Sequence, residues 1–173
     1  MPTCTPIFTE SQRFRQWWLW AIVIPGPVFL IWATIAELFR TASEGGGIGT
    51  VFVLALFTLL FGIVLPAFLF RAGLETEVYE DVVRVRFIPI HRNWQSFAFI
   101  SIDAVEAKTY RPIRDYGGWG IRYGGPGKAY NVSGNHGVLL DLADGTTLMI
   151  GSQRPEELAA AIRANGTEGS PRP

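Results

Sequence analysis

The sequence predicts a membrane α-helical hairpin followed by an all-β domain, and three observations carry this prediction. Two long apolar segments without a charged residue lie before Arg71. After Arg71, apolar and polar residues alternate, which is typical of half-buried strands. The segment SQRPEELAAAIRANG has the pattern of a helix. The β domain is therefore predicted as a bent barrel or sandwich of about seven antiparallel strands capped by a C-terminal α-helix.

Composition limits the possible functions. Hydrophobic residues make up 49% of the 173-residue chain and charged residues only 17%. The formal net charge is zero, which gives no argument for nucleic acid as a partner. Cys4 is the single cysteine, so neither an intrachain disulfide nor a cysteine-based zinc site can form.

Two segments, 17–36 and 50–70, are predicted to cross the membrane. At about 1.5 Å per residue each reaches roughly 30 Å, the thickness of the hydrocarbon core of a bilayer. So small a chain could not bury two helices that are apolar all round, so core helices are disfavoured. A cleaved signal peptide is also disfavoured, because a second span follows the first. Pro25-Gly26-Pro27 predicts a kink in the first span, around which helices pack.

The arginines predict the orientation. Arg13 and Arg15 precede the first span and Arg71 follows the second, whereas the connecting loop offers only Arg40 beside two glutamates. Positive residues stay inside, so we expect a multi-pass protein of the cell (inner) membrane with cytoplasmic N- and C-termini. The predicted parts are a cytoplasmic N-terminus at 1–15, transmembrane helices at 16–39 and 50–70, an extracytoplasmic loop at 40–49, the cytoplasmic β domain with its helix at 71–166, and a disordered tail at 167–173.

Two hairpins can be placed with their register. A turn at Glu80-Asp81 pairs Val78 with Val83, Thr76 with Val85 and Leu74 with Phe87 on one face, and Glu77 with Arg84 and Glu75 with Arg86 on the other. A turn at Ala143-Asp144-Gly145 pairs Leu140 with Leu148 and Val138 with Ile150. Further strands are predicted at 97–100, 104–110, 119–123 and 128–132, and Ser152 is the predicted N-cap of the last helix. No βαβ alternation occurs, so parallel pairing is not expected.

The glycine-rich stretch YGGWGIRYGGPGKAYNVSGNHG, residues 116–137, invites comparison with phosphate-binding loops. In a P-loop alignment, Arg122 stands where glycine is required and Ala129 stands where Ser or Thr is required. In a G-x-G-x-x-G alignment, Tyr123 replaces the last glycine. Tight turns therefore explain the glycines better. His91 and His136 lack cysteines or carboxylates at metal-ligand spacing, and no G-x-S-x-G motif occurs. We expect no enzymatic activity, no cofactor and no metal ion.

A basic, aromatic stretch contains the candidate binding surface. Residues 82–131 hold eight arginines and lysines against three acidic residues, with tyrosines and a tryptophan between them. The first interpretation is a solvated face whose arginines pair with local acids. Contact with anionic lipid headgroups is the second, and nucleic acid is the least favoured. The candidate residues are Arg111, Arg114, Tyr116, Trp119, Arg122 and Lys128.

Three segments carry a resemblance to a known group: ETEVYEDVVRVRFIPIH, IDAVEAKTYRP and GWGIRYGGPGKAYNVSGNHGVLLDLADGTTLMIGSQRPEELAAAI. Over residues 74–164 the chain resembles uncharacterised bacterial and archaeal membrane proteins with two N-terminal transmembrane helices and a pleckstrin-homology-like (PH-like) domain. The resemblance implies a bent antiparallel barrel with one end covered by the C-terminal helix, and no catalytic motif. Eukaryotic namesakes bind phosphoinositides through a basic loop between the first two strands. Here that turn is the acidic Glu80-Asp81, so we do not expect that activity.

The expected function is that of a membrane-anchored, non-enzymatic binding or scaffolding protein. Its partners would be the lipid bilayer and a membrane-proximal protein, met by a β domain that contacts that protein or anionic headgroups. The alternative is an accessory subunit of a membrane transporter or multiprotein complex, with the transmembrane helices as the interface. A small membrane enzyme is the least favoured class, because no acid/base or nucleophile set is visible.

Overall fold

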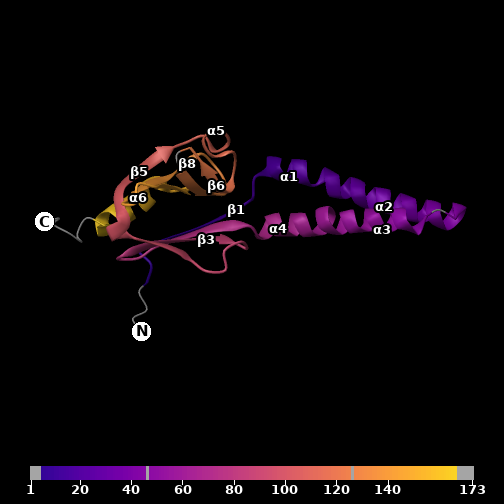
Figure 1. Cartoon of the computed structure of the whole chain (residues 1–173), viewed down its shortest axis with the longest axis horizontal. Coiled ribbons are helices and arrows are strands. Elements are labelled where there is room, and N and C mark those ends of the chain that lie inside the picture. Colours follow the sequence, from indigo (N-terminus) through magenta and orange to yellow (C-terminus); the bar gives the residue numbers. More distant parts are fainter. Residues whose placement is uncertain (1–4, 46, 126, 167–173) are drawn as a thin grey trace. The chain divides into compact units, whose positions relative to one another are not determined.

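The computed structural model describes residues 5–45, 47–125 and 127–166, and its chain separates into two compact units. One unit is the helical segment Phe14–Arg71, and the other joins Met1–Arg13 to Ala72–Pro173 (Figure 1). The helical unit is therefore an insertion in the β unit, not a segment that precedes it.

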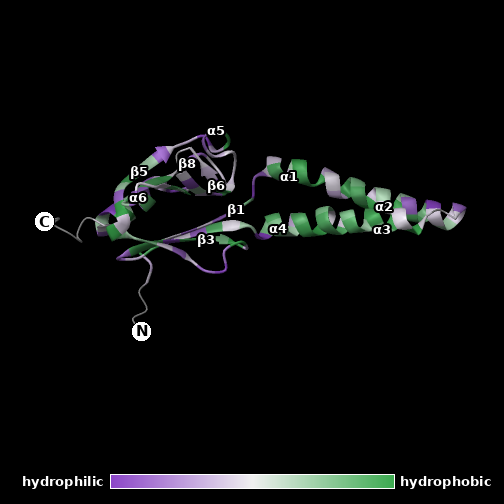
Figure 2. Cartoon of the chain, viewed as in Figure 1, coloured by the Kyte–Doolittle hydropathy of each residue, from purple (hydrophilic) through white to green (hydrophobic). Residues whose placement is uncertain are grey.

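The helical unit is a hairpin of two long arms. The first arm comprises α1 (Trp17–Val23) and α2 (Pro25–Glu44), and the second comprises α3 (Ile48–Phe57), the π-helix η1 (Thr58–Val64) and α4 (Leu65–Arg71). Apolar residues surround both arms and polar ones gather toward the tip (Figure 2). Both arms are long and apolar enough to cross a membrane, and their most apolar stretches are not buried within the structure.

The tip of the hairpin differs from the predicted loop at 40–49. α2 continues to Glu44 and α3 starts at Ile48, so the connection is much shorter. Arg40 forms an ion pair with Glu37 one turn earlier at 2.7 Å, which supports the extra helical turns. The helix ends at Gly45, whose φ of 72° is the left-handed conformation that glycine adopts readily.

The two arms contact each other through small and polar residues. The break between α1, which ends at Val23, and α2, which starts at Pro25, falls at the Pro25-Gly26-Pro27 segment for which a kink is predicted. A Cβ added to Gly62 of η1 would lie 3.9 Å from Pro27 Cα, so the backbones approach closely there. The Thr34 and Thr58 hydroxyls lie 2.9 Å apart and join the arms.

The first sheet of the β unit has the order β1-β2-β3-β4. Its strands are β1 (Phe8–Arg13), β2 (Gly73–Val78), β3 (Val82–Ile88) and β4 (Gln95–Ala98). All five predicted pairs of the β2–β3 hairpin are confirmed. The apolar members of these pairs are buried, whereas the glutamates and arginines on the other face are half-buried. The strand predicted at 97–100 lies two residues earlier, at 95–98, because Phe99–Ser101 form a 3₁₀ turn, η2.

Strand β1 lies in the segment that was predicted only as a cytoplasmic N-terminus. It pairs with β2 along its whole length, from Phe8 opposite Val78 to Arg13 opposite Gly73. The apolar/polar alternation failed to predict it because two of its three inward positions, Glu10 and Gln12, are polar, and only Phe8 is apolar. Gln12 Nε2 donates to the Gly151 carbonyl at 2.7 Å, and the Gln153 N–H donates to Glu10 at 2.7 Å.

The second sheet has the order β5-β8-β9-β7-β6. Its strands are β5 (Ile102–Thr109), β6 (Gly120–Gly124), β7 (Gly127–Asn131), β8 (His136–Leu142) and β9 (Thr147–Gly151). The predicted register of β8 and β9 is confirmed. The expectation of purely antiparallel pairing is wrong, because β7 and β9 are parallel. The strand β8 lies in the same sheet, antiparallel to β9, and returns the chain between the two parallel strands, so no crossover helix is needed.

Helix α6 (Pro155–Gly166) closes the β unit by burying Leu158, Ala159 and Ile162. It starts three residues after the predicted N-cap, and Ser152 Oγ instead accepts the Arg154 N–H at 2.9 Å. The described residues thus form two sheets of four and five strands rather than about seven strands. They also include a short helix that was not predicted, α5 (Pro112–Tyr116). The predicted tail at 167–173 lies outside the described residues.

Candidate functional site

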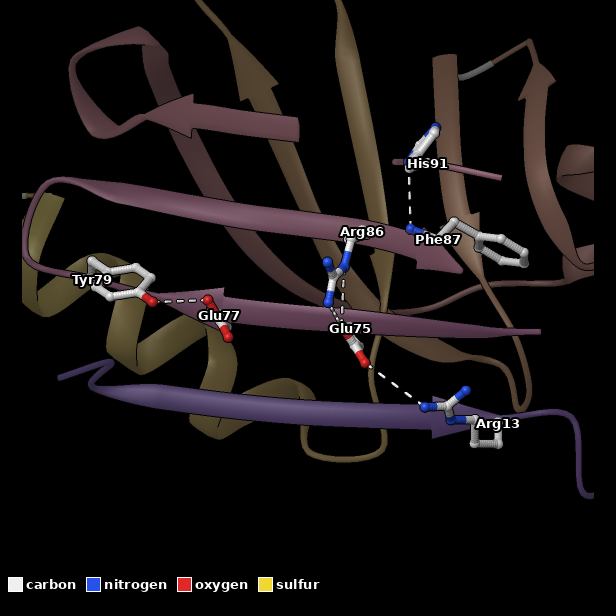
Figure 3. Close-up of polar contacts among 7 residues, drawn as sticks. All are labelled: Arg13, Glu75, Glu77, Tyr79, Arg86, Phe87 and His91. Carbon is white, nitrogen blue, oxygen red and sulfur yellow. Dashed lines mark hydrogen bonds and ion pairs between the residues drawn. The ribbon is translucent and has the colours of Figure 1, made fainter. Parts of the chain in front are cut away.

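One end of the first sheet carries both connections to the helical hairpin. The chain leaves the β unit after Arg13 and returns at Ala72. Arg13 pairs with Gly73, and Gly73 pairs with Ile88. We call the end defined by Arg13, Gly73 and Ile88 the junction end. The turn after β3, with His91, belongs to it, and Figure 3 shows Arg13 at the end of β1 and His91 beyond the same end of β3.

The outer face of the first sheet holds paired charges. Arg86 Nη2 lies 2.6 Å from Glu75, and Arg13 approaches the same carboxylate at 3.8 Å (Figure 3). The Tyr79 hydroxyl donates to Glu77 at 2.8 Å. A shallow hollow of about 290 Å³ lies on this face. It is lined by Thr9, Glu10, Ser11, Glu75, Thr76, Glu77, Arg86 and Trp94. Each glutamate that lines the hollow already has a partner: Arg86 and Arg13 for Glu75, the Tyr79 hydroxyl for Glu77, and Ser152 and the Gln153 N–H for Glu10. This face therefore fits a solvated surface better than a ligand site.

Part of the predicted binding surface lies on α5, and one of its residues is buried. Arg111 and Arg114 are exposed on either side of Pro112 and Ile113. Tyr116 is only 4% exposed, which corrects its assignment to a binding surface. Its ring meets Tyr110 edge-on, with the centroids 5.8 Å apart. The short helix turns Tyr116 inward and leaves Ile113 exposed.

The β6–β7 hairpin places the remaining predicted residues on different faces. Arg122 pairs with Ala129, whereas Lys128 pairs with Tyr123. Neighbouring residues of a strand point to opposite faces, so Arg122 and Lys128 cannot contact one ligand from the same side. Arg122 Nε donates to the Trp119 carbonyl at 2.9 Å, and Trp119 Nε1 donates to the Gly134 carbonyl at 3.2 Å. The predicted surface is therefore not a single patch.

Lys128 instead forms a cluster with three aromatic residues, His91, Tyr123 and Tyr130, which we call the His91–Lys128 cluster. Its Nζ lies 4.6 Å from the Tyr130 ring centroid and 5.5 Å from that of Tyr123. His91 meets the Tyr130 ring edge-on, with the centroids 5.5 Å apart. Tyr130 is fully buried, His91 and Lys128 are half-buried, and Tyr123 is exposed. The cluster thus joins the second sheet to the junction end of the first.

The electrostatics of the cluster follow from burial and from these contacts. Burial alone would lower the pKa of Lys128, but Tyr130 and Tyr123 outweigh it, so its pKa is raised and the ammonium persists. Burial, and then the Lys128 charge, lower the pKa of His91. Its Nδ1 accepts the Phe87 N–H at 3.4 Å (Figure 3). The neutral ring therefore carries its hydrogen on Nε2, where it can be donated.

A family model matches residues 1–167, which include both arms of the hairpin and both sheets. The chain belongs to DUF6141, a family of unknown function. No curated protein matches the chain, and no solved structure matches it either. Within the described part of this DUF6141 chain, no three His, Cys, Asp or Glu side chains gather as they would around a metal ion.

Sequence reasoning missed the cluster in this DUF6141 protein for two reasons. The turn between β6 and β7 at Gly124–Gly127 could have placed Tyr123 opposite Lys128, with Tyr130 two residues further on the same face. His91 was considered only as a metal ligand. Its contact with Tyr130 joins two different sheets, and no local pattern predicts such a contact.

Tyr110 gives the DUF6141 β unit a predictable sensitivity to alkali. It is 5% exposed, and its hydroxyl lies beside the Asn131 side chain. Burial raises the pKa of Tyr110 to about 12 from 10.0. The unfolded chain therefore loses this proton first, so the tyrosine's contribution to stability is complete below pH 10 and is lost as the pH rises through about 12. The loss amounts to about 2–3 kcal/mol at most.

Replacing Tyr110 with phenylalanine should remove that part of the pH dependence. The free energy of unfolding at pH 7 should change by no more than about 1 kcal/mol, because the substitution keeps the buried ring and removes only the hydroxyl and its contact with Asn131. Denaturant unfolding of the purified protein between pH 8 and pH 11.5 measures both quantities. Tyr123→Phe, at an exposed position, is the control and should keep the original slope. An unchanged slope in Tyr110→Phe would contradict the assignment.

Proposed function

We propose that this protein is a membrane-anchored, non-enzymatic binding or scaffolding protein. The two arms of its hairpin cross the inner cell membrane, and its β unit, a PH-like bent barrel, lies in the cytoplasm. There the β unit contacts a protein partner or anionic lipid headgroups. The observation that carries this proposal is the pairing of β1 with β2, the two strands that flank the hairpin.

The pairing of β1 with β2 supports a hairpin that crosses the membrane twice rather than once. Arg13 at the end of β1 and Gly73 at the start of β2 are direct neighbours in the first sheet. A chain that crossed the membrane only once between them would separate the strands by a bilayer. The all-round apolar surface of both arms supports the same conclusion, since large exposed apolar surfaces need a partner or a membrane.

The charges at the ends of the arms support the cytoplasmic side for the β unit. Arg13, Arg15 and Arg71 lie beside the connections, whereas Arg40 near the tip is paired with Glu37. The connections are short, with only Phe14–Gln16 before α1 and only Ala72 between α4 and β2. Such tethers hold the β unit close to the bilayer and raise its effective concentration for partners there.

Cysteine labelling in intact cells tests this arrangement. Cys4→Ser removes the single native cysteine, and Glu44→Cys or Gly125→Cys then places one in the tip or in the β6–β7 turn. A membrane-impermeant maleimide should label position 44 from outside and position 125 only after permeabilisation. Labelling of position 125 in intact cells would overturn the proposed orientation. Photo-crosslinking from position 125 would then identify a protein neighbour.

An accessory subunit that binds through its hairpin is the second candidate. The π-helix η1 and the interruption before Pro25 bring irregular backbone of both arms together at Gly62 and Pro27. Irregular helical segments are frequent at functional sites. Replacing the hairpin with an unrelated two-helix anchor separates the candidates. A binding module keeps its crosslinked partner after this exchange, whereas a hairpin-mediated subunit loses it.

A further inference from the structure

The His91–Lys128 cluster combines a cation with hydrogen-bond donors that no acid occupies. Among the described residues, Lys128 forms no ion pair with a carboxylate. The Tyr130 ring is fully buried and lies against the Lys128 ammonium. The Nε2 hydrogen of His91, whose ring also contacts Tyr130, adds a neutral donor to the cluster. A phosphate needs this combination of one fixed positive charge and neutral donors.

Exposed residues in and beside the cluster are of the types found at a lipid–water interface. Ile90 is 54% exposed and Tyr123 is 76% exposed. Arg92 is exposed and forms no ion pair within the described residues. A tyrosine with an apolar ring and a polar tip, beside an aliphatic residue and an arginine, is typical of surfaces at the headgroup level of a bilayer.

The register places this group at the end of the β unit that is tied to the spans. Ile90, His91 and Arg92 follow β3, whose last residue, Ile88, pairs with Gly73. Gly73 is separated from helix α4 by Ala72 alone. Lys128 and Tyr130 join this end through the contact of Tyr130 with His91. A bilayer crossed by the hairpin is therefore within reach of the cluster.

We propose that the His91–Lys128 cluster, with Ile90 and Arg92, docks on the phosphates of anionic lipids in the bilayer that the hairpin crosses. This inference rests on the proposed function, because it needs the hairpin in a membrane. It identifies lipid, rather than a protein, as the ligand of this surface. It also replaces the six predicted residues, of which only Lys128 is retained.

Contact quenching in lipid nanodiscs tests the proposal on the full chain. A fluorophore is attached to Gly125→Cys in the Cys4→Ser background, where the added side chain has open space. The nanodiscs contain neutral phosphatidylcholine with or without phosphatidylglycerol, and a nitroxide on the lipid headgroup quenches fluorophores that touch it. Quenching should rise with phosphatidylglycerol and fall at high salt. A fluorophore at Glu80→Cys, in the turn at the opposite end of the first sheet, should not respond.

Neutralising the proposed contacts should strongly weaken the quenching response. Lys128→Gln with Arg92→Gln should weaken docking about 30-fold, or about fivefold per charge. Arg111→Gln with Arg114→Gln removes the same charge from α5 and should leave the quenching unchanged. Equal quenching in neutral and anionic discs would overturn the proposal. The proposal would also be overturned if the fluorophore at Glu80→Cys were quenched as strongly as that at position 125. The same holds if quenching were lost only in the Arg111→Gln, Arg114→Gln variant. The proposed function would survive these failures if position 44 is still labelled from outside and position 125 still crosslinks to a protein.

Discussion

A chain in which a short turn replaces residues 14–71 should fold as a water-soluble β unit and stay in the supernatant when membranes are sedimented. Arg13 and Gly73 are paired neighbours, so a turn of about two to four residues can join β1 to β2 as an ordinary hairpin. The excision removes both apolar arms and leaves every described strand in place. Sedimentation and circular dichroism of the purified chain measure the outcome.

The matched comparison is a chain that starts at Ala72 and lacks β1 as well. It loses Gln12, whose amide donates to the Gly151 carbonyl, and Glu10, which accepts the Gln153 N–H. The buried Gly151 carbonyl is left without a partner, which costs about 1–3 kcal/mol, and the edge of β2 is uncovered. We expect this chain to aggregate or to unfold at much lower denaturant concentration. Equal stability of the two chains would contradict the role assigned to β1.

Leu140→Ala should lower the free energy of unfolding of the β unit by about 2–5 kcal/mol. Leu140 is fully buried in β8, between Val105 of β5 and Leu148 of β9. Its truncation leaves a cavity in the middle of the second sheet, where neighbouring strands on both sides limit collapse. Denaturant unfolding of the soluble chain described above, or thermal unfolding of the full chain in detergent, measures the loss.

Leu142→Ala is the control for that substitution. Leu142 lies on the same strand and face, two residues further on, but is only half-buried. Its truncation should cost clearly less, because water already reaches the side chain and no closed cavity remains. A loss as large as that of Leu140→Ala would mean that the interior of the β unit does not lie where the register places it.

The features of the fold that could be predicted from the sequence depend on patterns within short segments. The Glu80-Asp81 and Asp144-Gly145 turns, together with period-two alternation, specify a register over only a few residues on either side. Both registers are confirmed in the structure. The helical arms were predictable for the same reason, since a continuous apolar run needs no knowledge of the rest of the chain.

The candidate site was less predictable. Sequence reasoning selected basic and aromatic residues because they are close in the chain. In the structure, Arg122 and Lys128 lie on opposite faces of the β6–β7 hairpin, and Tyr116 points into the interior. The role of β1 shows the same limit. Its polar inward residues have partners far along the chain, as in the hydrogen bond from Gln12 to Gly151, which spans 139 residues.

By itself, the sequence determined the apolar arms, the two hairpin registers and the closing helix, because each depends on periodicity and turn residues within a short segment. Only the tertiary structure decided that β1 completes the first sheet, that β7 lies parallel to β9, and that His91 meets Tyr130 beside Lys128. These contacts join residues that are distant in the chain. Their free energy depends on how separate elements pack, and no single segment contains that information.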